Sequence, residues 1–65
     1  MTKINGEEIS LPNPTTIKDY LTLNNYRTEA VAVEINGNIL PKSSYDSYVI
    51  TEYDTIEIVS FVGGG

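Results

Sequence analysis

Two Asn-Gly pairs constrain how this chain can fold. They occupy positions 5–6 and 36–37, and each lies between short segments that contain apolar residues. Asn-Gly is the strongest short hairpin signal, because a type I′ turn needs a positive φ at both of its central residues. The first pair therefore predicts a hairpin whose strands occupy residues 2–5 and 7–11.

The second pair follows a run of alternating apolar residues, which predicts a half-buried strand over 31–35. After the turn, a short strand at 38–40 is expected at the edge of the sheet, because Pro41 cannot donate to a ladder. Alternation returns after the polar segment 42–53 and predicts a last strand from Thr55 to Val62.

Between the hairpins the apolar spacing changes from two residues to about four, which predicts a helix over residues 16–24. Pro12 and Pro14 end the strand that precedes it, because proline withholds the ladder donor. Thr15 or Thr16 offers an N-cap, and Asp19 places a carboxylate in the first turn. A helix this short must pack on a sheet to persist.

The order of elements is hairpin, helix, strand, short strand and final strand. It predicts the α+β class and a β-grasp (ubiquitin-like) fold, a mixed sheet of four to five strands with one main helix packed on one face. We expect a single domain over 1–62 and a flexible Gly-Gly-Gly tail at 63–65, called the tail below. The expected core comprises Ile4, Ile9, Leu11, Val31, Val33, Ile35, Leu40, Ile56 and Ile58 beneath Ile17 and Leu21.

The composition removes most catalytic chemistry. The chain has no cysteine and no histidine, so disulfides, thiolate or imidazole metal sites, cysteine nucleophiles and histidine-based triads are excluded. Carboxylates occur in pairs at Glu7-Glu8 and at Glu52 and Asp54, but both pairs lie beside predicted turns and are expected to be solvated. We therefore expect neither an enzyme nor a metal site.

The net charge of -5 argues against nucleic acid and anionic membranes as partners, because both attract basic residues. No segment has the length of a membrane span or the apolar core of a signal peptide, so a cytoplasmic location is expected. The tyrosines lack interleaved basic residues and are expected to be structural. Tyr20 and Tyr26 should pack at the helix, and Tyr45, Tyr48 and Tyr53 should cover the edge of the core.

The last predicted strand has two faces with different roles. Ile56 and Ile58 belong to the core, whereas Val59 and Phe61 are apolar residues on the face that the helix leaves open. An apolar patch beside the end of a chain indicates a docking surface. The residues expected to dock a partner are Ala32, Glu34, Glu57, Val59 and Phe61.

The tail follows this patterned strand without a linker. Glycine costs more entropy to order than other residues, so a packed terminus would not normally use three in a row. A tail without side chains can enter a narrow channel and present its terminal carboxylate to a reagent. The sequence thus singles out Gly63, Gly64 and Gly65 as a segment that could reach a partner's active site.

These segments resemble a known family. Residues 54–65, DTIEIVSFVGGG, resemble the C-terminus of the ThiS family of sulfur carriers in thiamine biosynthesis. Residues 4–7, 16–19 and 33–37 fall where that family has its hairpin, helix and middle strand. The sequence departs from many relatives at Lys42, where they have arginine after the proline, and in its tyrosine-rich segment 45–53.

The resemblance implies a co-substrate cycle. A ThiF-type adenylyltransferase would use ATP and magnesium to convert the Gly65 carboxylate to an acyl-adenylate, and sulfur from a persulfide donor would replace AMP. The resulting thiocarboxylate would pass its sulfur to a ThiG-type thiazole synthase for thiazole formation. The carrier itself would bind no cofactor, and Val59 and Phe61 would dock it.

Three alternatives remain open at this point. The chain could carry sulfur for another pathway, such as molybdopterin synthesis or tRNA thiolation, because those carriers also end in Gly-Gly. It could be a non-covalent ubiquitin-like interaction module, which would not need a free C-terminal glycine. It could also be a modifier that is attached to lysines.

Overall fold

The computed structural model describes residues 1–61 of the chain, so Val62 and the predicted tail lie outside the described residues. Its regular elements include two single-turn 3-10 helices, labelled η. In chain order the elements are β1 (Thr2–Ile4), β2 (Glu7–Ile9), α1 (Ile17–Leu23), η1 (Thr28–Ala30), β3 (Val31–Ile35), β4 (Asn38–Ile39), η2 (Lys42–Ser44) and β5 (Thr55–Ser60).

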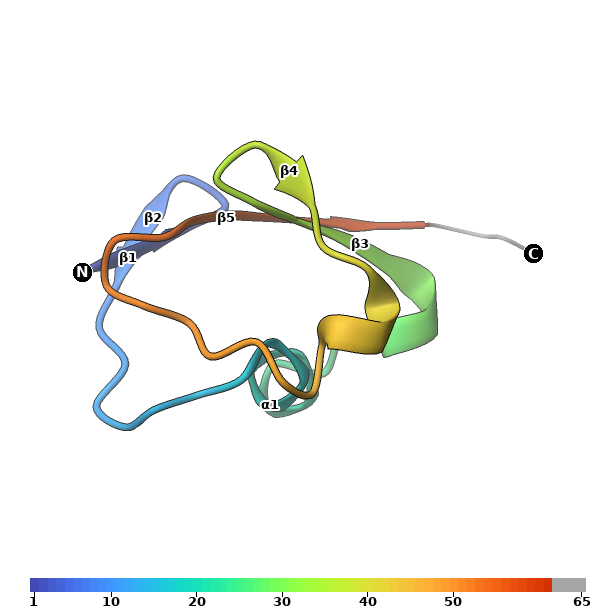
Figure 1. Cartoon of the computed structure of the whole chain (residues 1–65), viewed down its shortest axis with the longest axis horizontal. Helices are drawn as coiled ribbons and strands as arrows, with labels where there is room; N and C mark the ends of the chain where they lie inside the picture. The colour runs from blue at the N-terminus through green and yellow to red at the C-terminus, as the bar shows by residue number, and fades with distance from the viewer. Residues whose placement is uncertain (62–65) are drawn as a thin grey trace.

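The five strands form one mixed sheet in the order β2-β1-β5-β3-β4. The first and last strands are parallel neighbours at its centre, and every other pairing is antiparallel. Figure 1 shows α1 across one face of this sheet, together with the orange segment that precedes β5. The predicted β-grasp arrangement is therefore confirmed.

Both Asn-Gly turns have the predicted backbone conformation. Asn5 and Gly6 have φ values of 51° and 84°, and Asn36 and Gly37 have 52° and 89°. The second hairpin has the predicted β3 and a shorter β4, whereas β2 ends two residues earlier than expected. The reason is that β1 begins at Thr2, which pairs with Ile9, so residues beyond Ile9 have no neighbour on β1.

The helix matches its prediction to within one residue at each end. Thr16 is the N-cap, and its hydroxyl accepts a hydrogen bond from the amide of Asp19 at 3.1 Å. Ile17 and Leu21 are fully buried beneath the sheet. The helix has seven residues, and across residues 1–61 no helix has both the length and the apolar character needed to cross a bilayer.

The core contains most of the predicted residues and two more: Ile50, which was not predicted, and Tyr45, which was expected to cover only its edge. Tyr45 and Ile50 are buried, although they belong to the segment expected to be polar. Backbone hydrogen bonds draw this segment onto the start of the helix, from Ile50 to Thr15 and from Ile17 to Tyr48. By contrast, three residues predicted to be core lie only partly buried at its rim: Ile9, Leu11 and Leu40.

Two further predictions were wrong just before β5. Tyr53 is 85% exposed and does not cover the core. Asp54, expected to be solvated, is only 5% exposed. Its carboxylate accepts hydrogen bonds from the Thr51 amide at 2.9 Å, the Asn36 side chain at 3.0 Å and the Tyr48 hydroxyl at 3.1 Å. These donors explain how the charge can be buried, because a buried carboxylate needs hydrogen bonds to replace water.

Candidate functional site on the open sheet face

The two faces of β5 differ as alternation predicts. Ile56 and Ile58 are buried against the helix side, whereas Val59 and Phe61 are 52% and 57% exposed. In the ladder with β3, Val59 lies opposite Ala32, so these two side chains share the uncovered face. A shift of the strand register by one residue would have exchanged the buried and exposed side chains. The apolar residues predicted to dock a partner therefore lie together on the uncovered face, and their docking role stays a prediction.

The acidic part of the predicted surface lies on the same face. Glu57 is the partner of Glu34 in the β3–β5 ladder, and Glu34 is in turn the partner of Ile39 on β4. Ile39 is 63% exposed. We call the face that carries these residues the open face, and it comprises Ala32, Glu34, Ile39, Glu57, Val59 and Phe61.

Sequence reasoning did not assign Ile39 to this face. The signal was available, because a two-residue turn at 36–37 pairs Ile35 with Asn38 and therefore Glu34 with Ile39. Ile39 extends the apolar area beyond β5. Together with Pro41 and Phe61 it lines a hollow of about 180 Å³ at the edge of the sheet.

The end of β5 joins this face to the tail. The ladder pairs Ser60 with Val31, and the amide of Phe61 then donates to the carbonyl of Ala30 at 2.8 Å. The structure thus brings all five predicted docking residues onto one face, and their strand leads toward the tail. Gly63, Gly64 and Gly65 lie outside the described residues.

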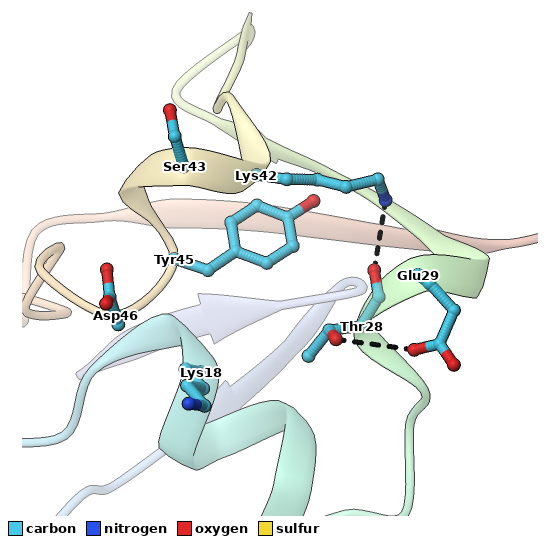
Figure 2. Close-up of a pocket in the computed structure, with 7 residues that line it drawn as sticks. All are labelled: Lys18, Thr28, Glu29, Lys42, Ser43, Tyr45 and Asp46. Carbon is cyan, nitrogen blue, oxygen red and sulfur yellow. Dashed lines mark hydrogen bonds between the residues drawn. The ribbon is translucent and has the colours of Figure 1, made fainter.

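A second hollow shares Lys42 and Tyr45 with the first. Figure 2 shows its lining, which encloses about 310 Å³ and comprises Lys18, Thr28, Glu29, Lys42, Ser43, Tyr45 and Asp46. Its charges are mixed in sign. Burial raises the pKa of the Tyr45 hydroxyl, which keeps that group neutral. Over residues 1–61, no three acidic side chains gather in a way that could hold a metal ion.

The sequence profile of the ThiS family matches residues 1–65. The chain belongs to the ThiS family. It is 38% identical over 66 residues to the sulfur carrier protein ThiS of Bacillus subtilis, and the match covers 100% of both chains. Its fold is similar to the crystal structure of the thiamine biosynthesis protein ThiS from Geobacter metallireducens, with a TM-score of 0.79 and 27% identity over 98% of this chain and 97% of that one.

A larger relative of this ThiS-family chain is a thiazole synthase. The thiazole synthase of Paramagnetospirillum magneticum is 42% identical to it over 62 residues, which cover 95% of this chain but 19% of that protein. These likenesses confirm the family expected from the sequence. The chain is a small sulfur carrier of thiamine biosynthesis and not itself a catalyst.

Proposed function

We propose that Gly65 carries the sulfur as a C-terminal thiocarboxylate and that the open face docks the proteins that load and unload it. The observation that carries the proposal is the end of β5. Val59 and Phe61 are half-exposed apolar residues on a strand that leads, after Val62, directly into Gly-Gly-Gly. A docking surface followed in sequence by a tail without side chains suits a substrate that a partner binds and then modifies at its C-terminus.

The loading step needs activation, because a carboxylate is a poor acyl donor. In the proposed step, a ThiF-type adenylyltransferase binds ATP and magnesium. A Gly65 carboxylate oxygen then attacks the α-phosphorus and pyrophosphate leaves, which gives an acyl-adenylate. AMP is a good leaving group, so the carbonyl carbon becomes open to attack. Because this step consumes ATP, we place the carrier in the cytoplasm.

Sulfur enters in the next step. A persulfide sulfur attacks the activated carbonyl carbon and AMP leaves, forming an acyl disulfide. A second thiol then attacks the cysteine sulfur of the donor and forms a disulfide with it, so the S–S bond to the acyl sulfur breaks and the thiocarboxylate remains on Gly65. Its sulfur is a strong nucleophile, which suits transfer to a ThiG-type thiazole synthase. The thiazole synthase that includes a region similar to this chain supports that choice of acceptor.

The chain's own residues bind and orient rather than react. Val59 and Phe61, with Ala32 beside them, offer apolar area that a partner can cover. Glu34 and Glu57 lie on the same face, where they favour a partner surface that brings basic groups. Gly63 and Gly64 have no side chains to obstruct a narrow active-site channel.

The test is to load the protein in vitro. It is incubated with a purified ThiF-type adenylyltransferase, ATP, magnesium and a persulfide donor, and its intact mass is measured. We expect one oxygen-to-sulfur exchange, which fragmentation assigns to the C-terminal peptide. A reaction without ATP serves as the control. Sulfur on an internal residue, or no exchange with an enzyme that loads the Bacillus subtilis carrier, would contradict the proposal.

A further inference from the structure

The turn that receives the amide of Phe61 is itself held by a side chain from a distant segment. Phe61 donates to the carbonyl of Ala30. The Lys42 ammonium donates to the carbonyls of Thr28 and Val31, at 3.0 Å and 2.7 Å. Figure 2 shows the Lys42 side chain extending from η2 to η1, where its ammonium donates to the Thr28 carbonyl. We call these two bonds the Lys42 clamp.

The clamp acts on a weak element. A 3-10 helix has poor hydrogen-bond geometry, and η1 is one turn of three residues. Hydrogen bonds from a charged donor are roughly twice as strong as neutral ones, so one ammonium on two carbonyls can fix this turn. The two bonds join residues 14 and 11 positions apart, and they hold η2 against η1.

We propose that Lys42 is a positioning residue for the loading of Gly65. It fixes the carbonyl that accepts the Phe61 amide, and it thereby fixes the direction in which the chain leaves the sheet relative to the open face. This inference rests on the proposed function, because the direction matters only if a docked partner must receive the chain end.

The sensitivity of the reaction to position supports this role. Four residues follow Phe61, and fully extended they span at most about 13–14 Å. The partner would hold Val59 and Phe61 on one side and must receive the carboxylate at a fixed distance. A displacement of about 1 Å can cost a factor of roughly a hundred in a positioned reaction. A shift of η1 therefore moves the point from which residues 62–65 start. This should lower the rate of loading more than it lowers the affinity for the partner.

Lys42 could instead have only a structural role or contact the partner directly. Its ammonium lies 5.7 Å from the centre of the Tyr45 ring, and its side chain lines both hollows. Lys42→Met separates these roles, because methionine keeps most of the aliphatic stem and removes the charge and both hydrogen bonds. Lys42→Arg keeps a charged donor. Lys18→Met is the matched control, because Lys18 lines the same hollow from α1.

Two measurements are made on each variant. Amide hydrogen exchange of the free protein reports the Phe61 bond without any enzyme. Steady-state pyrophosphate release with the ThiF-type adenylyltransferase, ATP and magnesium gives kcat, and binding to that enzyme gives Kd. For Lys42→Met we expect exchange at Phe61 to rise about tenfold and kcat to fall at least about tenfold, with Kd changed by less than about twofold. Lys42→Arg should restore both, and Lys18→Met should behave as the wild type.

Several outcomes would overturn the role of Lys42. Unchanged exchange at Phe61 would mean that the clamp does not hold the turn. A rise at Ile58 as large as at Phe61 would mean that Lys42 stabilises the whole fold. An increased Kd with unchanged kcat would indicate direct contact with the partner, and an equal loss in Lys18→Met would indicate a general charge effect. Wild-type protein that is never adenylated would overturn the proposed function as well, whereas a loaded wild type with an unimpaired Lys42→Met overturns only the clamp.

Discussion

The side-chain amide of Asn36 donates to the carboxylate of Asp54 over 3.0 Å, and its carbonyl oxygen accepts the amide of Thr55 at 2.9 Å. The second turn is thereby tied to the start of β5. The first turn contacts the same strand, because the Asn5 side chain accepts the amide of Ile58 at 2.8 Å. Both Asn-Gly turns therefore fix the strand that carries the docking residues.

The Asp54 carboxylate should make folding sensitive to acid. Burial alone would raise the pKa of Asp54, but hydrogen bonds from Thr51, Asn36 and Tyr48 outweigh burial and lower the pKa below its ordinary value of 3.8. A carboxyl with a lowered pKa stabilises the fold above its unfolded-state value, and this stabilisation is lost as the pH falls through the folded-state pKa. Asp54→Asn should lower the free energy of unfolding at neutral pH by about 1–3 kcal/mol.

The check is urea unfolding, followed by circular dichroism, at neutral pH and at several values below about pH 4. The stability of the wild type should fall more steeply with acid than that of Asp54→Asn. Asp46→Asn is the matched control, because Asp46 is exposed and its loss should matter little. Equal stability of Asp54→Asn and the wild type across this range would show that the buried carboxylate contributes nothing.

Ile58 reports on the thin core beneath the open face. It is 7% exposed and lies opposite Val33 in the ladder. Ile58→Ala should lower the free energy of unfolding by about 2–5 kcal/mol, because it removes packed methyl groups and leaves a cavity. Ile58→Val, as the smaller change, should cost about 0.5–1.5 kcal/mol. Equal and small losses in the two variants would mean that the side chain lies at the rim of the core.

Charges on the open face should separate docking from folding. Val59→Asp and Phe61→Asp should leave the free energy of unfolding nearly unchanged, because both side chains are half exposed. Each should weaken binding to the adenylyltransferase, since the new carboxylate would lose water at the interface without a partner. Binding is measured by calorimetry. Tyr53→Asp is the matched control, because Tyr53 is 85% exposed and precedes the opposite end of β5. Unfolding of either face variant would refute the assignment of these residues.

Period-two alternation and the Asn-Gly turns were sufficient to predict the strands and the faces of β5, because both signals are local. Tyr45, Ile50 and Asp54 could not be assigned in this way. Their segment has no periodicity, and hydrogen bonds to residues far away in sequence help to place it, such as those from Ile50 to Thr15 and from Asn36 to Asp54. Polar and aromatic residues mixed without a period in a loop give no sign of which side chain turns inward.

The same distinction applies to the candidate site. Val59 and Phe61 follow from alternation along one strand, whereas the place of Ile39 depends on the register that its turn imposes. The sequence marks Lys42 only as a departure from the arginine common in relatives. Its hydrogen-bond partners, Thr28 and Val31, lie 14 and 11 positions away, so only the fold brings them together.

The length of the tail should be the most stringent requirement for loading. Deleting Gly65, or adding one glycine after it, should abolish pyrophosphate release with the adenylyltransferase, because one extended residue moves the carboxylate by about 3.3–3.6 Å. That is several times the displacement of about 1 Å that can cost a factor of roughly a hundred. Stability should stay nearly constant, since glycine has no side chain to bury.

One glycine added before Met1 is the matched control, because Met1 is 70% exposed and β1 runs parallel to β5, which puts the N-terminus beside the start of β5. Binding is measured in parallel. An extended variant that binds and still releases pyrophosphate would refute the requirement for a carboxylate at Gly65, whereas one that binds without turnover would support it.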